Sequence, residues 1–222
     1  MKLEGLKINF LGDSITQGVG ASSAETVYHA VLKKEAKLAE ARNYGISGTR
    51  FALQKGTEWR PKDEFVDVNS FSERFAMMDD DADVVVVFGG TNDYGHGDAP
   101  IGGFTDRTPD TFYGACHYLF SGLIKKYLGK QIVIMTPLHR VDEFRNNGSG
   151  KPWGSATLRE YVNIIREVAE YYSLPVLDLY ASSGMQPEVL EIKENFIPDG
   201  LHPNDNGNAV IARKLKIFLE NL

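Results

Sequence analysis

The sequence predicts an α/β fold, in which helices cover both faces of a doubly wound, mostly parallel sheet of five strands. Short apolar runs alternate with longer amphipathic stretches along the chain, a pattern typical of strands and helices joined by right-handed crossovers. The run Val84–Phe88 is apolar at every residue, which indicates a central strand covered on both faces. The chain has 222 residues and no repeat or Pro-rich linker, so we expect a single domain over residues 1–222.

The individual elements follow in order along the chain. Residues 7–11 are predicted as a first strand, and residues 27–41, rich in Ala, Leu, Lys and Glu, as the helix after it. Residues 42–44 are a brief second strand, and residues 70–78 are a helix that precedes the apolar strand Val84–Phe88. The remaining predictions are helices over residues 112–127, 158–172 and 206–219, and strands over residues 131–136 and 175–178.

Composition argues against several classes of function. The net charge of −6 and the pI near 5.4 give no general field for attracting nucleic acid or an anionic membrane surface. No apolar run is long enough to span a bilayer, and charged residues interrupt the first ten positions, unlike a secretory signal. Cys116 is the only cysteine, so no internal disulfide can form. We therefore expect a cytoplasmic protein with no nucleic-acid partner and no membrane insertion, unless a leader has been removed.

Four polar segments, three of them directly after predicted strands and one before the last helix, are the candidate sites of chemistry. Ligands of parallel sheets bind at the carboxyl ends of the strands. Each segment alone also fits a tight turn or a helix cap. In chain order they are residues 12–16 (GDSIT), 43–48 (NYGISG), 89–93 (GGTND) and 199–203 (DGLHP).

These segments supply the groups that acyl transfer requires. A serine hydroxyl is a poor nucleophile unless a base removes its proton, and Ser14 and His202 suit these two roles. Asp199, three residues before His202, can accept the Nδ1–H of the imidazole and leave Nε2 free for the proton. Asn92 offers a neutral amide donor to a developing oxyanion. Asp93 is expected to hold its own loop together through backbone hydrogen bonds.

The four segments in this order resemble the signature blocks of the SGNH, or GDSL-like, hydrolases, a family of esterases and acylhydrolases. The resemblance spans the chain from Gly12 to Pro203. It implies the flavodoxin-like α/β fold of that family, a Ser14 nucleophile, and a His202 base with Asp199 behind it.

The resemblance also implies an oxyanion hole. Its donors would be the N–H of Ser14, the side chain of Asn92 and a glycine N–H. That glycine is Gly48 or Gly45, of which Gly48 is the better match to the second block. Ile15 stands where the family name has Leu, a swap between aliphatic side chains of equal size that leaves the chemistry untouched.

No metal, cofactor or nucleotide is expected. His96 with Asp98, and His139 with Asp142, lack a recognised zinc spacing. A P-loop and a complete dinucleotide-binding glycine motif are absent, and so is the G-x-S-x-G elbow of ordinary α/β-hydrolases.

The residues and the resemblance together predict a serine esterase that cleaves a carboxylic ester through an acyl-enzyme on Ser14. Loops 94–110 and 137–155 are long, and loops of this length are commonly functional. Their glycines and the lack of a large apolar lid favour short acyl groups, and we expect acetyl groups on carbohydrate. Aromatic residues in these loops fit either sugar stacking or packing of the loops. The candidate substrate-binding residues are Asp13, Tyr94, His96, His139 and Trp153, with Phe104 and Trp59 as further aromatic candidates.

Other functions fit the same residues. A lysophospholipase or thioesterase would use the same triad on a longer acyl chain, and a transferase would replace water by an acceptor alcohol. A carbohydrate-binding module could keep the fold without turnover. Labelling of Ser14 by a serine-directed fluorophosphonate separates that module from the enzymes, because only an activated nucleophile reacts.

Overall fold

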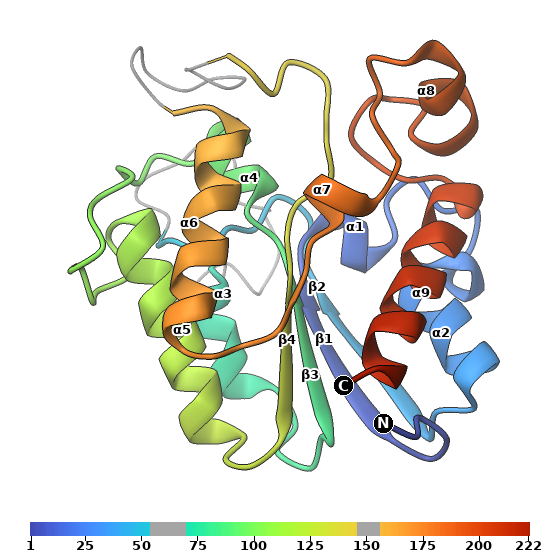
Figure 1. Cartoon of the computed structure of the whole chain (residues 1–222), viewed down its shortest axis with the longest axis horizontal. Helices are drawn as coiled ribbons and strands as arrows, with labels where there is room; N and C mark the ends of the chain where they lie inside the picture. Colours follow the sequence, from blue (N-terminus) through green and yellow to red (C-terminus); the bar gives the residue numbers. More distant parts are fainter. Residues whose placement is uncertain (54–69, 146–155) are drawn as a thin grey trace.

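The sheet of this protein has five strands, all parallel, in the order β2-β1-β3-β4-β5. The computed structural model describes residues 1–53, 70–145 and 156–222. The predicted α/β fold with a doubly wound sheet is confirmed (Figure 1). The strands are β1 (Lys7–Gly12), β2 (Glu40–Gly45), β3 (Val84–Phe88), β4 (Gln131–Met135) and β5 (Val176–Leu177).

Helices cover both faces of the sheet. Figure 1 shows α3, α5 and α6 on one face and α2 and α9 on the other. Val85 and Val87 of β3 belong to the core beneath the first group, whereas Val84 and Val86 belong to the core beneath the second, as the two-residue period of a strand requires. The covering helices are α2 (Tyr28–Ala36), α3 (Phe71–Arg74), α5 (Phe112–Lys126), α6 (Leu158–Tyr171) and α9 (Asp205–Glu220), with 3₁₀ turns η1 (Ala24–Thr26) and η2 (Phe75–Met77).

Four short helices lie at the carboxyl ends of the strands, at the top of Figure 1. The chain termini lie at the opposite end, where the amino group of Met1 donates to the carbonyl of Glu220 at 2.8 Å. In this strand order the winding reverses between β1 and β3, and the ends of these two strands are where such sheets bind ligands. The short helices are α1 (Ser14–Gln17), α4 (Thr91–His96), α7 (Leu179–Ser182) and α8 (Leu190–Phe196).

The helix predicted over residues 27–41 ends earlier, at Ala36. Lys37 takes a left-handed conformation with φ of 54° and closes the helix by donating its N–H to Lys33 O. The chain can then enter β2, where Arg42 forms ion pairs with Asp79 and Asp81. The composition of residues 27–41 does not reveal where the helix ends, because β2 is held by ion pairs with residues that lie far away in sequence.

Two other predicted elements differ in detail. The helix expected over residues 70–78 consists of α3 followed by the 3₁₀ turn η2. The last strand is shorter than predicted and spans only Val176–Leu177. Within residues 1–53, 70–145 and 156–222, no helix combines the length and the apolar character needed to cross a bilayer.

Candidate active site

Ser14 is the first residue of α1, directly after β1. Asp13 caps this helix by accepting a hydrogen bond from the N–H of Ile15 at 3.0 Å. A Cβ at Gly12 would fall 1.9 Å from Thr16 Oγ1, so only glycine lets the chain turn this tightly. Because Ser14 opens the helix, its N–H has no acceptor within the helix.

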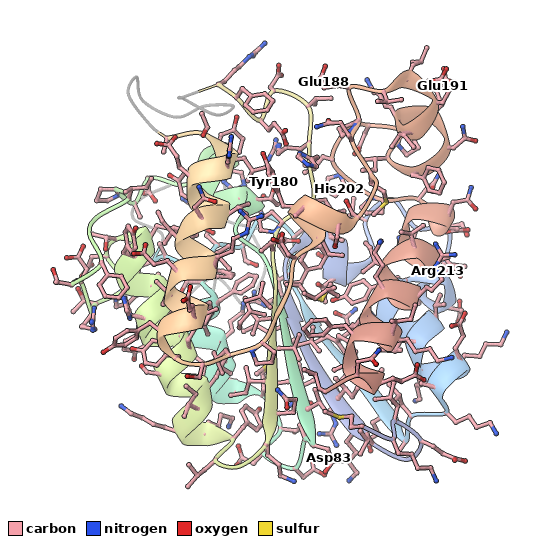
Figure 2. The ribbon with its side chains drawn as sticks, viewed as in Figure 1. Asp83, Tyr180, Glu188, Glu191, His202 and Arg213 are labelled. Carbon is pink, nitrogen blue, oxygen red and sulfur yellow. The ribbon has the colours of Figure 1, made fainter. Side chains whose placement is uncertain are left out.

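His202 meets Ser14 from the other end of the chain. Its Nε2 lies 2.9 Å from Ser14 Oγ, and its Nδ1 lies 2.6 Å from Asp199 Oδ2. The other oxygen of Asp199 accepts the N–H groups of Leu201 and His202 at 2.8 and 2.7 Å. Figure 2 shows His202 near the carboxyl end of the sheet and Asp83, the residue before β3, at the other end. Hydroxyl, imidazole and carboxylate thus form one hydrogen-bonded line.

Asp199 is held ready to orient an imidazolium. Partial burial opposes its ionisation, but hydrogen bonds from the backbone and side chain of His202 and from the Leu201 N–H outweigh this, so the pKa of Asp199 lies below its usual value. The carboxylate therefore stays ionised around neutral pH and keeps the proton of His202 on Nδ1.

Asn92, the second residue of α4, brings an amide to the same place. Its Nδ2 donates to the carbonyl of Thr49 at 3.0 Å, and only 5% of the residue is exposed. β1 and β3 are neighbours and pair Gly12 with Phe88, so the segments that follow them, with Ser14 and Asn92, start side by side.

The structure separates the two candidate glycines. The N–H of Gly45 already donates to Asn43 Oδ1 at 2.8 Å, and a Cβ at Gly45 would fall 2.3 Å from the backbone nitrogen of Gln17. Gly45 therefore lets β2 pack closely against α1. Gly48 has a φ of 75°, and its N–H makes no hydrogen bond within the part of the chain that the structure describes. Of the two, Gly48 is the one whose N–H is available to an oxyanion.

A buried arginine ties these segments together from below. Arg74 donates to the carbonyls of Tyr44 and Gly12 at 2.7 and 3.1 Å and to Thr49 Oγ1 at 2.8 Å. Burial lowers the pKa of Arg74 to about 10, and the charge of Asp13 offsets only part of this effect. In the same environment burial raises the pKa of Asp13 to about 6. The side chain of Arg74 fixes the ends of β1 and β2 relative to the loop that contains Gly48.

The candidate substrate-binding residues take several different positions. Asp13 and Tyr94 are each 1% exposed, and Tyr94 donates its hydroxyl to backbone carbonyls of Asp142 and Arg145, so both are structural. His96 lies on Asn92, with Nε2 3.2 Å from Asn92 Oδ1. Asp13 and Tyr94 are therefore closed off from solvent, whereas His96 is partly exposed and contacts the amide of Asn92.

His139 is held by two contacts. Its Nδ1 lies 2.8 Å from the buried carboxylate of Glu143, and its ring centroid lies 3.9 Å from that of Tyr180. Trp153 and Trp59 lie outside the described residues. Phe104 packs edge-on against Tyr113, His117 and Tyr171, as expected if the aromatic residue holds its loop down.

Two further features complete the site. Asp93 accepts the N–H groups of Phe51 and Ala52 at 2.9 and 3.0 Å, the backbone role predicted for it. Arg140, which sequence reasoning missed, donates to the carbonyl and hydroxyl of Thr91 at 3.3 and 3.2 Å at the start of α4. A single arginine in a polar loop is expected to be solvated, so the sequence did not predict a role for Arg140. No group of three or more His, Cys, Asp or Glu side chains suited to a metal ion occurs in the described ranges.

The sheet is parallel, and a hydrogen-bonded serine, histidine and aspartate lie where its winding reverses. This arrangement is that of serine ester hydrolases whose nucleophile begins the first helix. The model of the GDSL-like lipase/acylhydrolase family matches residues 10–210. The chain belongs to this family, and the family implies ester hydrolysis.

Solved structures are similar over almost the whole chain. A protein from Lactobacillus plantarum is 30% identical with a TM-score of 0.83, and the match covers 99% of this chain and 98% of that one. A second structure is 31% identical with a TM-score of 0.85, covering 100% and 99% of the two chains. An acetyl xylan esterase, AlAXEase, shares the fold at 22% identity and a TM-score of 0.62, covering 95% and 98%. The comparison with curated proteins gave no match.

Proposed function

We propose that the protein is a serine esterase that removes short acyl groups, such as acetyl, from carbohydrate through an acyl-enzyme on Ser14. The observation that carries this proposal is the hydrogen-bonded line from Ser14 Oγ through His202 to Asp199, with distances of 2.9 and 2.6 Å. A hydroxyl in contact with an oriented imidazole is the arrangement that activates serine at neutral pH.

The chemistry runs in two steps. Ser14 Oγ attacks the ester carbonyl while its proton passes to His202 Nε2, and the carbonyl oxygen becomes an oxyanion. When the intermediate collapses, the bond to the leaving alcohol breaks and the alcohol takes the proton from His202. Water then attacks the acyl-Ser14 ester, with His202 again accepting and returning a proton, to release the carboxylic acid and free Ser14.

Three donors would stabilise the oxyanion. These are the N–H of Ser14 at the start of α1, the N–H of Gly48, and an N–H of the Asn92 amide. Together these three N–H groups would stabilise the developing negative charge, and because they are neutral they would not neutralise the base.

The acyl length and the alcohol are the finer part of the proposal. The loop that follows α4 is rich in glycine, including Gly97, Gly102 and Gly103. A polar and pliant loop of this kind suits a hydroxyl-rich leaving group better than a long acyl chain. The likeness to AlAXEase, an acetyl xylan esterase, is in the same direction.

The test is a series of p-nitrophenyl esters from acetate to palmitate together with acetylated xylan and acetylated monosaccharides. We expect kcat/KM to be highest for acetate, acetate release from the acetylated sugars, and loss of both in Ser14→Ala. A fluorophosphonate should label the wild-type protein and not Ser14→Ala. A maximum at long acyl chains would replace the substrate class with a lysophospholipase or thioesterase type, and absence of labelling would remove Ser14 as nucleophile.

A further inference from the structure

The amide of Asn92 can serve an oxyanion only in one of its two orientations. Rotation by half a turn about χ2 exchanges an acceptor oxygen for a donor nitrogen of nearly the same shape. The orientation must therefore be fixed by neighbours that demand a donor at one end and an acceptor at the other. The carbonyl of Thr49, 3.0 Å from Asn92 Nδ2, demands a donor, and the Nε2 of His96, 3.2 Å from Asn92 Oδ1, demands an acceptor when the imidazole has its proton on Nε2.

We propose that His96 is a positioning residue, which donates its Nε2–H to Asn92 Oδ1 and thereby holds the amide nitrogen toward the substrate. The inference rests on the proposed function of Asn92 as an oxyanion donor and adds to it a residue that acts only through Asn92. The NH₂ group has two hydrogens, and one of them is used by Thr49. The second is left for the oxyanion.

A flipped amide would replace both hydrogen bonds by repulsive contacts. Asn92 Oδ1 would face the Thr49 carbonyl, and Asn92 Nδ2–H would face the Nε2–H of His96. Asn92 is 5% exposed, so water cannot easily compensate, and leaving buried polar groups unpaired costs about 1–3 kcal/mol each. A donor on His96 also polarises the amide, which strengthens the hydrogen bond that the nitrogen can give.

His96 is itself firmly placed. It is the last residue of α4 and lies four residues after Asn92, on the same face of the helix. Its carbonyl accepts a hydrogen bond at 3.3 Å from Arg50, a side chain only 1% exposed that also pairs with Asp98 at 2.8 Å. Because the imidazole is anchored through its backbone, its distance to Asn92 is part of the fold.

His96 does not compete with His202 for the role of base. His202 Nε2 is already within 2.9 Å of Ser14 Oγ, whereas the Nε2 of His96 is turned to the amide of Asn92. The alternative to positioning is a purely structural role, in which His96 stabilises α4 and its loss lowers stability without a specific effect on turnover.

The experiment is a double-mutant cycle on p-nitrophenyl acetate. His96→Gln keeps a side-chain N–H donor, and His96→Leu removes it; each is made in the wild type and in Asn92→Ala. An oxyanion donor contributes ~10²–10³ in turnover. Without the contact to His96 the Asn92 amide can rotate and loses part of this contribution. We therefore expect His96→Leu to lower kcat about tenfold with little change in KM. His96→Gln should stay within about threefold of wild type, and His96→Leu should have no further effect in Asn92→Ala.

A second readout does not depend on activity. The side-chain amide of Asn92 is assigned in a ¹⁵N–¹H spectrum by its loss in Asn92→Ala. We expect a resolved signal in wild type and His96→Gln, and a signal shifted toward that of free asparagine in His96→Leu.

The outcomes separate the two proposals. Equal effects of His96→Leu in both backgrounds, a His96→Gln as slow as His96→Leu, or an unchanged Asn92 signal would overturn the positioning role while leaving Ser14-dependent hydrolysis in place. Absence of Ser14-dependent hydrolysis in the wild type would overturn the proposed function instead, and the Asn92 signal would still report whether His96 orients the amide.

Discussion

Gly20 lies directly against the loop of His202: a Cβ on Gly20 would fall 3.0 Å from the Cβ of His202 and 2.7 Å from the carbonyl oxygen of Pro203. Gly20 and His202 are 182 positions apart in sequence, yet the backbone of Gly20 packs directly against His202. The position of the imidazole relative to Ser14 therefore depends on the absence of a side chain at residue 20.

Gly20→Ala should slow turnover by moving His202. The carbonyl of Pro203 is backbone and cannot rotate away from the new methyl group, so the loop must shift. Because a misplacement of about 1 Å can cost ~10²-fold in rate, we expect kcat to fall at least about tenfold. Steady-state kinetics on p-nitrophenyl acetate measure this.

Gly129→Ala is the matched control for backbone strain. Gly129 has a φ of 76°, close in kind to the 93° of Gly20, but a Cβ there meets nothing within 4 Å. Gly129→Ala should lose stability through backbone strain alone, and Gly20→Ala should lose more because its methyl group also meets the Pro203 carbonyl. Only Gly20→Ala should lose activity. Equal kcat in the two variants would show that His202 does not depend on Gly20.

Asp199→Asn should slow the reaction without unfolding the protein. An amide in place of the carboxylate would present an NH₂ group to Nδ1 of His202, which disfavours the tautomer with the proton on Nδ1. The side chain of Asp199 is 54% exposed, so water replaces part of its effect, and we expect kcat to fall about 10²-fold rather than the ~10⁴ known for a buried triad aspartate. Asp142→Asn, at a carboxylate of equal exposure outside the line, should stay within twofold of wild type.

Asp13→Asn should stabilise the protein at pH 8 and not at pH 4. Burial raises the pKa of Asp13 from 3.8 to about 6, so the folded protein keeps a proton that the unfolded chain has already released. Between these two values folding therefore becomes less favourable as pH rises, and the loss persists above pH 6. One pKa unit is about 1.4 kcal/mol, which sets an upper limit of about 3 kcal/mol.

Asparagine removes this cost and keeps the oxygen that caps Ile15. Urea unfolding of both proteins at pH 4 and pH 8 measures the difference. A stability gain that is the same at both pH values would mean that the pKa of Asp13 does not change on folding. A loss of stability at pH 8 would mean that the folded protein favours the ionised form of Asp13, through the charges of His202 and Arg74.

The sequence predicted most of the sheet because its signals are local. Val84–Phe88 is apolar on both faces, and the helices α5, α6 and α9 are long enough to show their apolar periodicity. The helix α4 has only six residues, fewer than two turns, so its residues were expected to belong to a loop. The predicted end of α2 was wrong because the start of β2 is stabilised by tertiary ion pairs, such as that of Arg42 with Asp81.

The candidate site shows the same division. Ser14, Asn92 and His202 could be proposed from short motifs, because each lies in a segment of glycine and polar residues next to a strand or helix end. The supporting side chains could not. Arg74 bonds the carbonyl of Gly12 from 62 positions away, and Tyr94, expected at the substrate, is buried because its aromatic ring packs on Tyr161.

Arg140 fixes the first turn of α4, on which Asn92 lies. Its guanidinium donates to the carbonyl and hydroxyl of Thr91 at 3.3 and 3.2 Å and lies 5.5 Å from the ring centroid of Tyr94. Gly95 makes room for it, because a Cβ there would fall 2.8 Å from the Arg140 Nη1 atom. Burial lowers the pKa of Arg140, although the charges of Tyr94 and Asp13 offset part of this effect.

Arg140→Met should therefore separate activity from stability. Methionine keeps the apolar stem and removes a charge whose burial is costly, so the free energy of unfolding should change by less than about 1 kcal/mol. The first turn of α4 loses its two hydrogen bonds, and the amide of Asn92 is then less well placed, so kcat should fall about tenfold while KM changes little. Arg140→Lys, which retains the charge and one donor, should recover part of the rate. If Arg140→Met loses stability and keeps kcat, the arginine serves the packing of the loop against α4, and it does not contribute to the placement of Asn92.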